Sequence, residues 1–204
     1  MLSRLVPICI FAITCHLAEP AYSDAVEYTA DKWHTRIFFE VRSGALVDYV
    51  GMFHDFDIEF KYDEEDISNS SVRVVIPVSS FETFHDGLSK KLQQAQFFDV
   101  ENYPAIEFQS TEVVRTSRNT ARLSGDLTMH GVTAPMSLDV TLNGSSPHQR
   151  YKKNVVGFSA RGTLDRHDFN LHLLPVTMVS SVVKIRIEMS AFEGESVPYY
   201  DKDD

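Results

Sequence analysis

The chain has 204 residues and a net charge of −10, from 29 acidic and 19 basic side chains. A nucleic-acid-binding protein needs a basic surface to displace counterions from phosphates, and the nearest basic cluster here is the short run Arg150 to Lys153. This composition excludes nucleic acid as the partner, and the length is sufficient for one hydrophobic core.

The first 23 residues have the order of a cleavable secretory signal peptide. Arg4 supplies a positive charge, Leu5 to Ile13 form an apolar stretch, and Ala21 and Ser23 are small residues before a cleavage site. The apolar stretch is shorter than the roughly 20 residues of a membrane-spanning helix. We therefore predict that residues 1–23 are removed, and that the mature chain is periplasmic or secreted without a transmembrane segment.

Both cysteines, Cys9 and Cys15, lie within this predicted signal peptide. The mature chain must therefore fold without disulfides. A lipoprotein would use Cys15 as its acylated residue, but Ala12-Ile13-Thr14 is a poor match to the context such a cysteine requires. We expect one domain over residues 24–192, followed by an acidic, disordered tail over residues 193–204.

Short strand-like segments separated by turn residues follow along the mature chain. Alternation is clear where Leu123 and Leu127 share one face and Ser124 and Asp126 share the other. Such a series predicts a sandwich or a barrel. The expected strands are Trp33 to Val41, Phe53 to Phe60, Val72 to Ile76, Ala105 to Val113, Ala121 to Met129, Val132 to Leu142, Val155 to Leu164 and Val182 to Ala191, with a turn at His130-Gly131.

One segment, from His85 to Phe98, has the spacing of a helix instead. Leu88, Leu92 and Ala95 recur at helical intervals, and Asp86 is a candidate cap for its start. We predict a single short helix that packs over a face or an end of the β-structure.

Four segments resemble, in order and spacing, the motifs of the YceI-like family of bacterial periplasmic proteins. They are Asp31-Lys32-Trp33-His34-Thr35, the run from Phe97 to Phe108, the run from Gly125 to Pro135, and Gly157-Phe158-Ser159-Ala160 followed by Leu164 to Phe169. Together they span the chain from about Tyr28 to Phe192. The resemblance implies an all-β fold, an extended eight-stranded antiparallel lipocalin-like β-barrel with one short helix. It also implies an apolar channel that holds an isoprenoid chain, and no firmly assigned catalytic reaction.

Three positions depart from the family pattern. Ile58 stands where the family has glycine after its aromatic motif, here Gly51, Phe53 and Phe56, and a side chain there would narrow the channel. Leu88 to Leu92 replaces the family's Arg-Asp-x-His-Leu stretch. Asn170 replaces a common glycine, which is a mild change because asparagine tolerates left-handed geometry.

Aromatic residues are the main candidates for the wall of such a channel. The chain has 14 phenylalanines and 8 tyrosines, and an eight-stranded barrel is wide enough for side chains or one slim ligand. We expect the ligand's tail to contact Phe53, Phe56, Phe81, Phe84, Leu92, Phe97, Phe98, Phe108 and Phe169, and its head group to contact His34, Thr35 and Lys91.

Three His-Asp pairs, at positions 54–55, 85–86 and 167–168, raise the alternatives of a metal site or of acid–base chemistry. Adjacent residues on a strand point to opposite faces, so a histidine and its own aspartate would not share a site there. A Gly-x-Ser-x-Gly nucleophile motif is also missing from the sequence. We therefore predict neither a metal nor a cofactor beyond a bound lipid.

The sequence thus favours a binding or carrier protein for an amphipathic lipid, namely a polyisoprenoid or an isoprenoid quinone. Two alternatives stay open: a barrel enzyme that acts on a lipid or quinone, and a structural or stress-related protein whose core is filled by side chains. Exposed barrel edges or mouths would also permit a homodimer.

Overall fold

The structure is a computed structural model, and it describes residues 25–172, 174–195 and 197. The predicted signal peptide, with both cysteines, lies outside the described residues, as does most of the predicted acidic tail.

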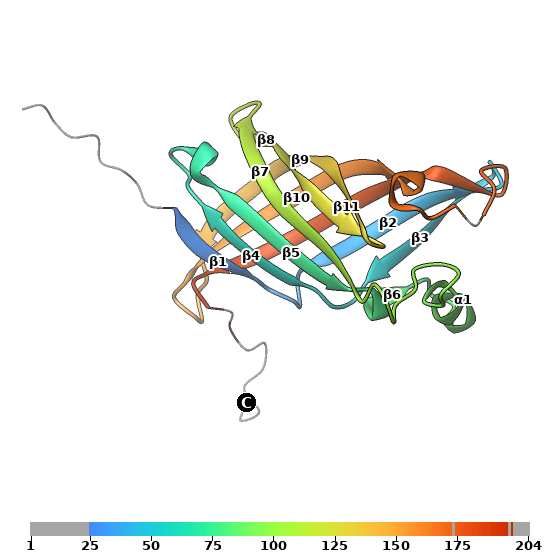
Figure 1. The fold of residues 1–204 in the computed structure, drawn as a ribbon. Coiled ribbons are helices and arrows are strands. Elements are labelled where there is room, and N and C mark those ends of the chain that lie inside the picture. Colours follow the sequence, from blue (N-terminus) through green and yellow to red (C-terminus); the bar gives the residue numbers. More distant parts are fainter. Residues whose placement is uncertain (1–24, 173, 196, 198–204) are drawn as a thin grey trace, which may run out of the picture.

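Eight strands close a barrel in which every neighbouring pair is antiparallel (Figure 1). In their order around the barrel they are β1 (Val26–Ala30), β4 (Asp57–Tyr62), β5 (Ser71–Pro77), β7 (Ala105–Arg115), β8 (Thr120–Met129), β9 (Val132–Pro147), β10 (Asn154–Asp165) and β11 (Val179–Glu193). Strand β11 pairs back onto β1. The predicted fold class, an eight-stranded antiparallel β-barrel with one short helix, is confirmed.

Three further strands extend one end of this barrel. β2 (Arg36–Ser43) pairs with the part of β11 that β1 does not reach, β3 (Val47–Phe53) pairs with β2, and β6 (Phe81–Glu82) pairs with the last two residues of β3. The helix α1 (Asp86–Leu92) and the chain that leads from it to β7 lie beside β6 at this end (Figure 1). We call it the wide end. The narrow end carries the β7–β8 hairpin and the short 3-10 helix η1 (Ile67–Asn69).

Two of the predicted strands are interrupted or begin late, because aspartate side chains form local turns. The Asp31 carboxylate accepts a hydrogen bond from the backbone N–H of Trp33 at 2.9 Å, so the strand predicted from Trp33 begins at Arg36. The Asp55 carboxylate accepts from the N–H of Phe56 at 2.9 Å, between β3 and β4. The sequence pattern did not predict β1.

The predicted turn at His130-Gly131 joins β8 to β9. Both residues have positive φ, 51° and 75°, as a two-residue turn of the type that matches strand twist requires. Gly131 is also needed for space, since a Cβ there would lie 2.6 Å from the Tyr103 ring.

Helix α1 is shorter than the sequence predicted and is capped one residue earlier. His85 is its N-cap, where the imidazole Nδ1 accepts from the N–H of Leu88 at 3.2 Å, and Asp86 is the first helical residue. The helix ends at Leu92, and the chain from there to Phe98 forms turns. In the described part of the chain, every helix is too short and too polar to cross a bilayer.

The alternation predicted for the β8 segment sets its inner face in the barrel. Leu123 and Leu127 are buried, whereas Asp126 is exposed on the outer face. Outside, charged side chains pair across strands, as Arg122 does with Asp139 at 2.8 Å. Inside, the apolar side chains do not fill the barrel, and the space that remains is the candidate site.

Candidate functional site

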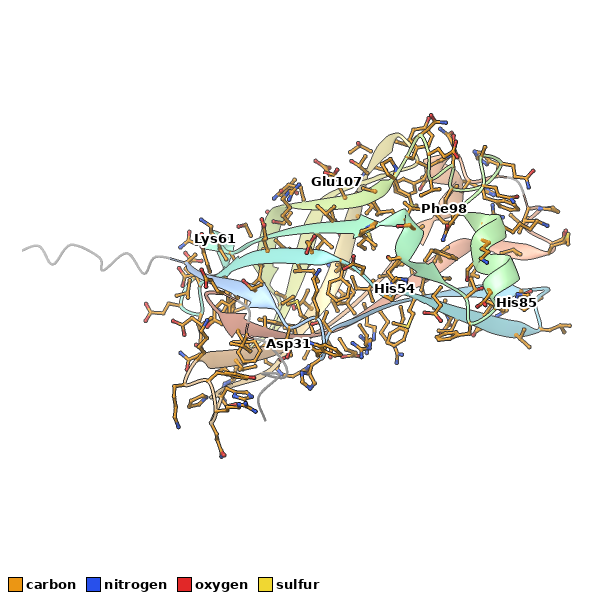
Figure 2. All side chains as sticks on the ribbon, turned by 90° about the horizontal axis from the view of Figure 1, so that it is seen from below. Asp31, His54, Lys61, His85, Phe98 and Glu107 are labelled. Carbon is orange, nitrogen blue, oxygen red and sulfur yellow. The ribbon has the colours of Figure 1, made fainter. Side chains whose placement is uncertain are left out.

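A cavity of about 470 Å³ lies at the wide end, between the barrel wall and the segment that contains α1. Its volume falls within the range of small-molecule sites, about 300–1,000 Å³. Phe98 lies beside α1 on this side, whereas Lys61 marks the narrow end (Figure 2). We call this cavity the large chamber.

Stacked aromatic rings form one wall of the large chamber. The Phe39 and Phe81 rings stack with centroids 4.6 Å apart, and Phe81 also contacts Phe98 at 5.2 Å. Gly51 makes this arrangement possible, because a Cβ at that position would lie 2.0 Å from the tip of the Phe39 ring. The wall is therefore a rigid, apolar surface built from β2, β6 and the chain after α1.

A small chamber of about 140 Å³ continues the interior toward the narrow end. Val74, Phe108, Leu138 and Ile187 line both chambers, so they form a waist between them. At the waist, a Cβ on Gly125 would lie 2.5 Å from the Phe108 ring, so glycine lets that ring lie flat against β8. The result is one apolar channel with a constriction.

Polar residues are a minority on the large-chamber wall. Among the described residues that line the large chamber, none is acidic; the polar lining consists of Ser43, Tyr49, Thr83, Gln96, His130, Arg166, Asn170 and His172. An otherwise acidic protein thus keeps its carboxylates away from this wall.

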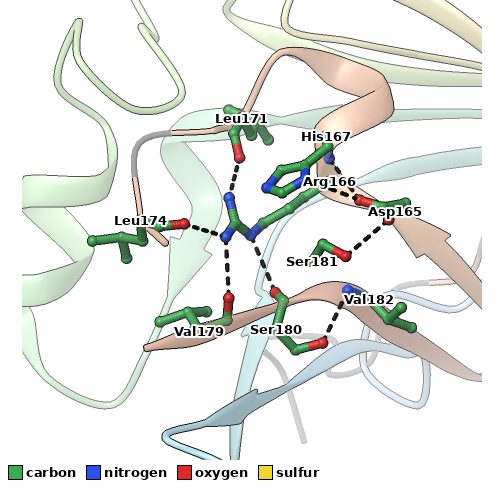
Figure 3. A network of polar contacts seen from close by, with 9 residues as sticks. All are labelled: Asp165, Arg166, His167, Leu171, Leu174, Val179, Ser180, Ser181 and Val182. Carbon is green, nitrogen blue, oxygen red and sulfur yellow. Dashed lines mark hydrogen bonds and ion pairs between the residues drawn. The ribbon is translucent and has the colours of Figure 1, made fainter. Parts of the chain in front are cut away.

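Arg166 is the one formal cation on the described large-chamber wall, and its donors are already engaged (Figure 3). It lies in the 3-10 helix η3 (Arg166–Phe169). The guanidinium donates to the carbonyl oxygens of Leu171, Leu174, Val179 and Ser180, at 3.1 Å for the last two. Burial lowers the pKa of Arg166. Arg166 therefore holds the β10–β11 connection in place at the cavity mouth.

Neighbouring polar groups at the mouth also have protein partners. The Asp165 carboxylate accepts from the N–H of His167 at 2.9 Å and from the Ser181 hydroxyl at 2.8 Å. These hydrogen bonds, the one from His167 first, lower the pKa of Asp165. His130 hydrogen-bonds through Nδ1 with the carbonyl of Phe169 at 3.1 Å. The mouth is thus a pre-formed structure.

Half of the residues predicted to contact a ligand line the channel. Phe53, Phe81, Leu92, Phe97 and Phe98 line the large chamber, and Phe108 lies at the waist. Ile58 lines the small chamber, where it reduces the free volume.

The other predicted tail contacts lie elsewhere. Phe56 and Phe169 are each 2% exposed but are not on the lining of either chamber, while Phe84, at φ 58°, is 65% exposed. Lys91 is absent from the chamber lining, and its ammonium lies 5.9 Å from the Phe97 ring centroid.

The predicted head-group residues His34 and Thr35 lie away from the channel. His34 Nδ1 is 2.6 Å from the buried Asp31 carboxylate. His34 and Asp31 line a separate pocket together with His148 and Phe192. Thr35 is fully buried and its hydroxyl donates to the Ser190 carbonyl at 3.2 Å. The structure does not bring these two residues to the large chamber.

Sequence reasoning missed His130, Arg166 and His172 as wall residues. Arg166 was part of a family motif, but nothing in that motif shows that its side chain turns toward loop carbonyls. The lining from β11 could have been found, because Val183, Ile185 and Ile187 alternate with charged residues and all three line the large chamber.

The three His-Asp pairs do not meet. Asp55 forms an ion pair with Lys32 at 3.1 Å, His85 caps α1, and the His167 ring contacts His172 at 4.7 Å. Within the described ranges, no group of three or more His, Cys, Asp or Glu side chains is arranged to hold a metal ion.

Comparison with known proteins supports the motifs seen in the sequence. Residues 28–191 match the model of the YceI-like domain. The chain belongs to the YceI-like family. It is 36% identical over 159 residues to a UPF0312 protein of Pectobacterium carotovorum, covering 76% of this chain and 81% of the relative.

Two solved structures superpose on this barrel. The YCEI protein of Campylobacter jejuni superposes with a TM-score of 0.70 at 25% identity, covering 74% of this chain and 88% of the other. A polyisoprenoid binding domain from Saccharophagus degradans superposes with a TM-score of 0.59 at 11% identity, covering 83% and 99%. At 11% identity the second match concerns the fold alone.

Proposed function

We propose that this YceI-like protein is a periplasmic binding or carrier protein for an amphipathic lipid with an isoprenoid tail, a polyisoprenoid or an isoprenoid quinone. The observation that carries the proposal is the two-chambered apolar channel inside the barrel. The Saccharophagus degradans neighbour, which is described as polyisoprenoid binding, has the same architecture. The signal-like order of residues 1–23 supports the periplasmic location.

The channel walls favour a long apolar tail on energetic grounds. Each buried methylene contributes about 0.8 kcal/mol, so a five-carbon unit contributes about 4 kcal/mol before ordering costs are subtracted. Few polar contacts are then needed for tight binding. A cationic head group is disfavoured, because the described lining of the large chamber includes Arg166 and no carboxylate.

The two alternatives fit the channel less well. A histidine that acts as an acid or base is commonly oriented by a carboxylate, and no described residue on the large-chamber wall gives His130 or His172 such a partner. A filled core would leave no space of about 470 Å³. Both observations favour binding over turnover and over a purely structural role.

Native mass spectrometry and lipid extraction of protein purified from its own host test the proposal. We expect an isoprenoid lipid to co-purify. The variant Phe97→Glu places a charge on the chamber wall and should abolish lipid retention, whereas Phe84→Glu, at an exposed position outside the chambers, should retain it. An empty wild-type protein with no lipid-induced thermal shift would refute the proposal.

Mass analysis of the mature N-terminus tests cleavage after Ser23.

A further inference from the structure

Apolar side chains project into solvent from two loops at the wide end. Leu46 and Val47 lie at the β2–β3 turn and are 84% and 59% exposed; Val176 and Met178 lie in the β10–β11 connection and are each 57% exposed. We call these four residues the rim patch. Such exposure of large apolar side chains in one place is unusual for a surface that contacts only water.

The two loops form one surface. The backbone N–H of Gly44 donates to the carbonyl of Met178 at 2.8 Å, and Ser43 pairs with Val179 in the ladder between β2 and β11. The ends of β2 and of the β10–β11 connection lie side by side at the wide end (Figure 1). The hydrogen bond therefore fixes the apolar tips relative to each other.

The rim patch borders the mouth of the large chamber. Ser43, Leu174 and Val179 line that chamber, and each is within a few residues of the patch. Arg166 holds the same connection through its bonds to Leu174 and Val179. The exposed loop tips are thus continuous with the lining of the channel through Leu174 and Val179.

The charge of this region is also distinctive. Residues 43–47 and 171–183 contain no acidic side chain, although the chain as a whole has 29. The nearest carboxylate in sequence, Asp48, is paired with Arg42 at 2.5 Å. The two segments that carry the rim patch therefore hold no negative charge of their own to repel an anionic surface; Asp168, in η3 just before the second segment, is the nearby exposed carboxylate.

From these observations we infer that the wide end docks onto a phospholipid bilayer, with the rim patch inserted into its interfacial region, so that a lipid tail passes between bilayer and channel without crossing water. This inference rests on the proposed lipid-binding function. It names the surface at which that lipid is exchanged.

A bilayer fits this surface better than a protein partner does. A stable protein interface needs roughly 1,000 Å² or more of buried area, whereas the rim patch consists of a few side chains on two projecting tips. Tips of this kind are suited to insertion among lipid head groups and upper acyl chains, where apolar side chains are buried to a shallow depth.

The narrow end provides a matched control. Val114, near the tip of the β7–β8 hairpin, is 46% exposed, but it is followed by Arg115 and lies at the opposite end of the barrel from the rim patch. A charge introduced at Val114 should therefore leave docking by the wide end unchanged.

The experiment compares the full mature chain with Leu46→Asp, with the double variant Leu46→Asp and Met178→Asp, and with Val114→Asp. Vesicles of phosphatidylethanolamine and phosphatidylglycerol serve as the membrane, and a fluorescent polyprenol serves as the lipid probe. Three quantities are measured: protein sedimented with vesicles, the rate of polyprenol transfer to vesicles, and polyprenol retained by the protein alone.

We expect the wild-type transfer rate to rise with vesicle concentration, as exchange by collision requires. The double variant should lose at least about tenfold in vesicle binding and in transfer rate. Its retention of polyprenol in solution should be unchanged, because the rim patch lies outside the chamber walls. Val114→Asp should behave as wild type in all three measurements.

The inference would be overturned if the double variant bound vesicles as strongly as the wild-type protein does. It would also be overturned if Val114→Asp lost as much vesicle binding as the double variant. The inference would also be overturned if the rim patch instead pairs two copies of the chain. In that case the wild-type protein sediments as a dimer, Leu46→Asp sediments as a monomer, and neither form binds vesicles. Vesicle sedimentation does not depend on a bound lipid. A protein that docks but retains no polyprenol would therefore contradict the proposed function and leave the docking surface standing.

Discussion

At the scale of single residues, Arg166 connects the fold to the mouth of the channel. Its guanidinium donates to four backbone carbonyls, two in the β10–β11 connection and two at the start of β11, so its loss removes four half-buried contacts at once. We expect Arg166→Leu to lower the free energy of unfolding by about 2 kcal/mol, because half-buried acceptors are left without protein partners. Urea denaturation followed by circular dichroism measures this loss.

Arg122→Leu is the matched control for the loss of an arginine. Arg122 pairs with Asp139 on the exposed outer face, where ion pairs contribute about 0–1 kcal/mol. Equal losses in the two variants would show that the bonds to the connection contribute nothing specific.

Ile58 sets the size of the small chamber. It is 6% exposed and lines that chamber. We expect Ile58→Ala to extend the channel and to shift the ratio of affinities toward polyprenols with longer tails. The lipid-free variant should lose about 2–4 kcal/mol of stability, as other large-to-small core changes do. Competition between polyprenols of two lengths measures the ratio.

Phe56→Ala separates this effect from general loosening of the core. Phe56 is 2% exposed but lines neither chamber, so its truncation should cost about 3–5 kcal/mol of stability. The chain-length ratio should not change. A shift of equal size in Phe56→Ala would mean that chamber volume does not select the tail.

Residue type alone did not tell which aromatic side chains face the channel. Alternation identified inward positions on regular strands, as with Leu123 and Leu127. It fails beside turns, where a single residue of positive φ, such as Phe84, redirects a side chain into solvent. His34 is likewise held away from the channel by Asp31, a contact that no periodic pattern encodes.

At the scale of elements, Asp63 organises the loop around η1. Its carboxylate accepts from the backbone N–H groups of Asp66 at 2.9 Å and Glu65 at 3.0 Å, and from the Asn69 amide at 3.0 Å. These hydrogen bonds, the one from Asp66 first, lower the pKa of Asp63. The ionised form is therefore the stabilising one.

A pH-dependent loss of stability follows for Asp63→Asn. Because the folded pKa lies below the ordinary value of about 3.9, the stabilisation is complete above that value and is lost as the pH falls through the folded pKa. We expect Asp63→Asn to be less stable than wild type at pH 7 and the difference to shrink toward pH ~3. Urea titrations at several pH values measure it, and a pH-independent difference would contradict it.

Asp139→Asn serves as the control, since Asp139 is an exposed carboxylate on the sheet. Its effect should be small at every pH.

The elements that the sequence predicted well are those whose inner and outer faces differ most. Strands β7 to β11 alternate over long runs and were predicted within a few residues, although β9 and β11 extend further than expected. The strands from β1 to β4 were harder, because Asp31 and Asp55 end or interrupt them through side-chain hydrogen bonds to the backbone. Hydrogen bonds of this kind, from a side chain to the nearby backbone, interrupt a strand with little change in its alternation of apolar and polar residues.

At the scale of the whole molecule, the two ends of the barrel have different surfaces. The wide end has the large chamber, an apolar rim and a mouth held by Arg166. The narrow end has the small chamber, whose lining includes Lys61, Arg115 and Arg118, and it also carries the acidic run from Asp63 to Asp66 beside η1. The two ends of the channel therefore differ in the polar groups that surround them.

Because the channel lies inside the core, ligand occupancy and stability should be linked. A lipid that binds only the folded state adds about 2.7 kcal/mol to the free energy of unfolding at a free concentration of 100 times its dissociation constant.

We expect delipidated wild-type protein to gain stability when a polyprenol is added. Phe97→Glu should show no gain, and Phe84→Glu should show the full gain, since only Phe97 lines the large chamber. Thermal unfolding at increasing polyprenol concentrations measures this. The double rim variant Leu46→Asp and Met178→Asp should keep the full gain while it loses transfer, which separates occupancy of the channel from access to it. A gain of equal size in Phe97→Glu would mean that the lipid stabilises the protein from a surface outside the channel.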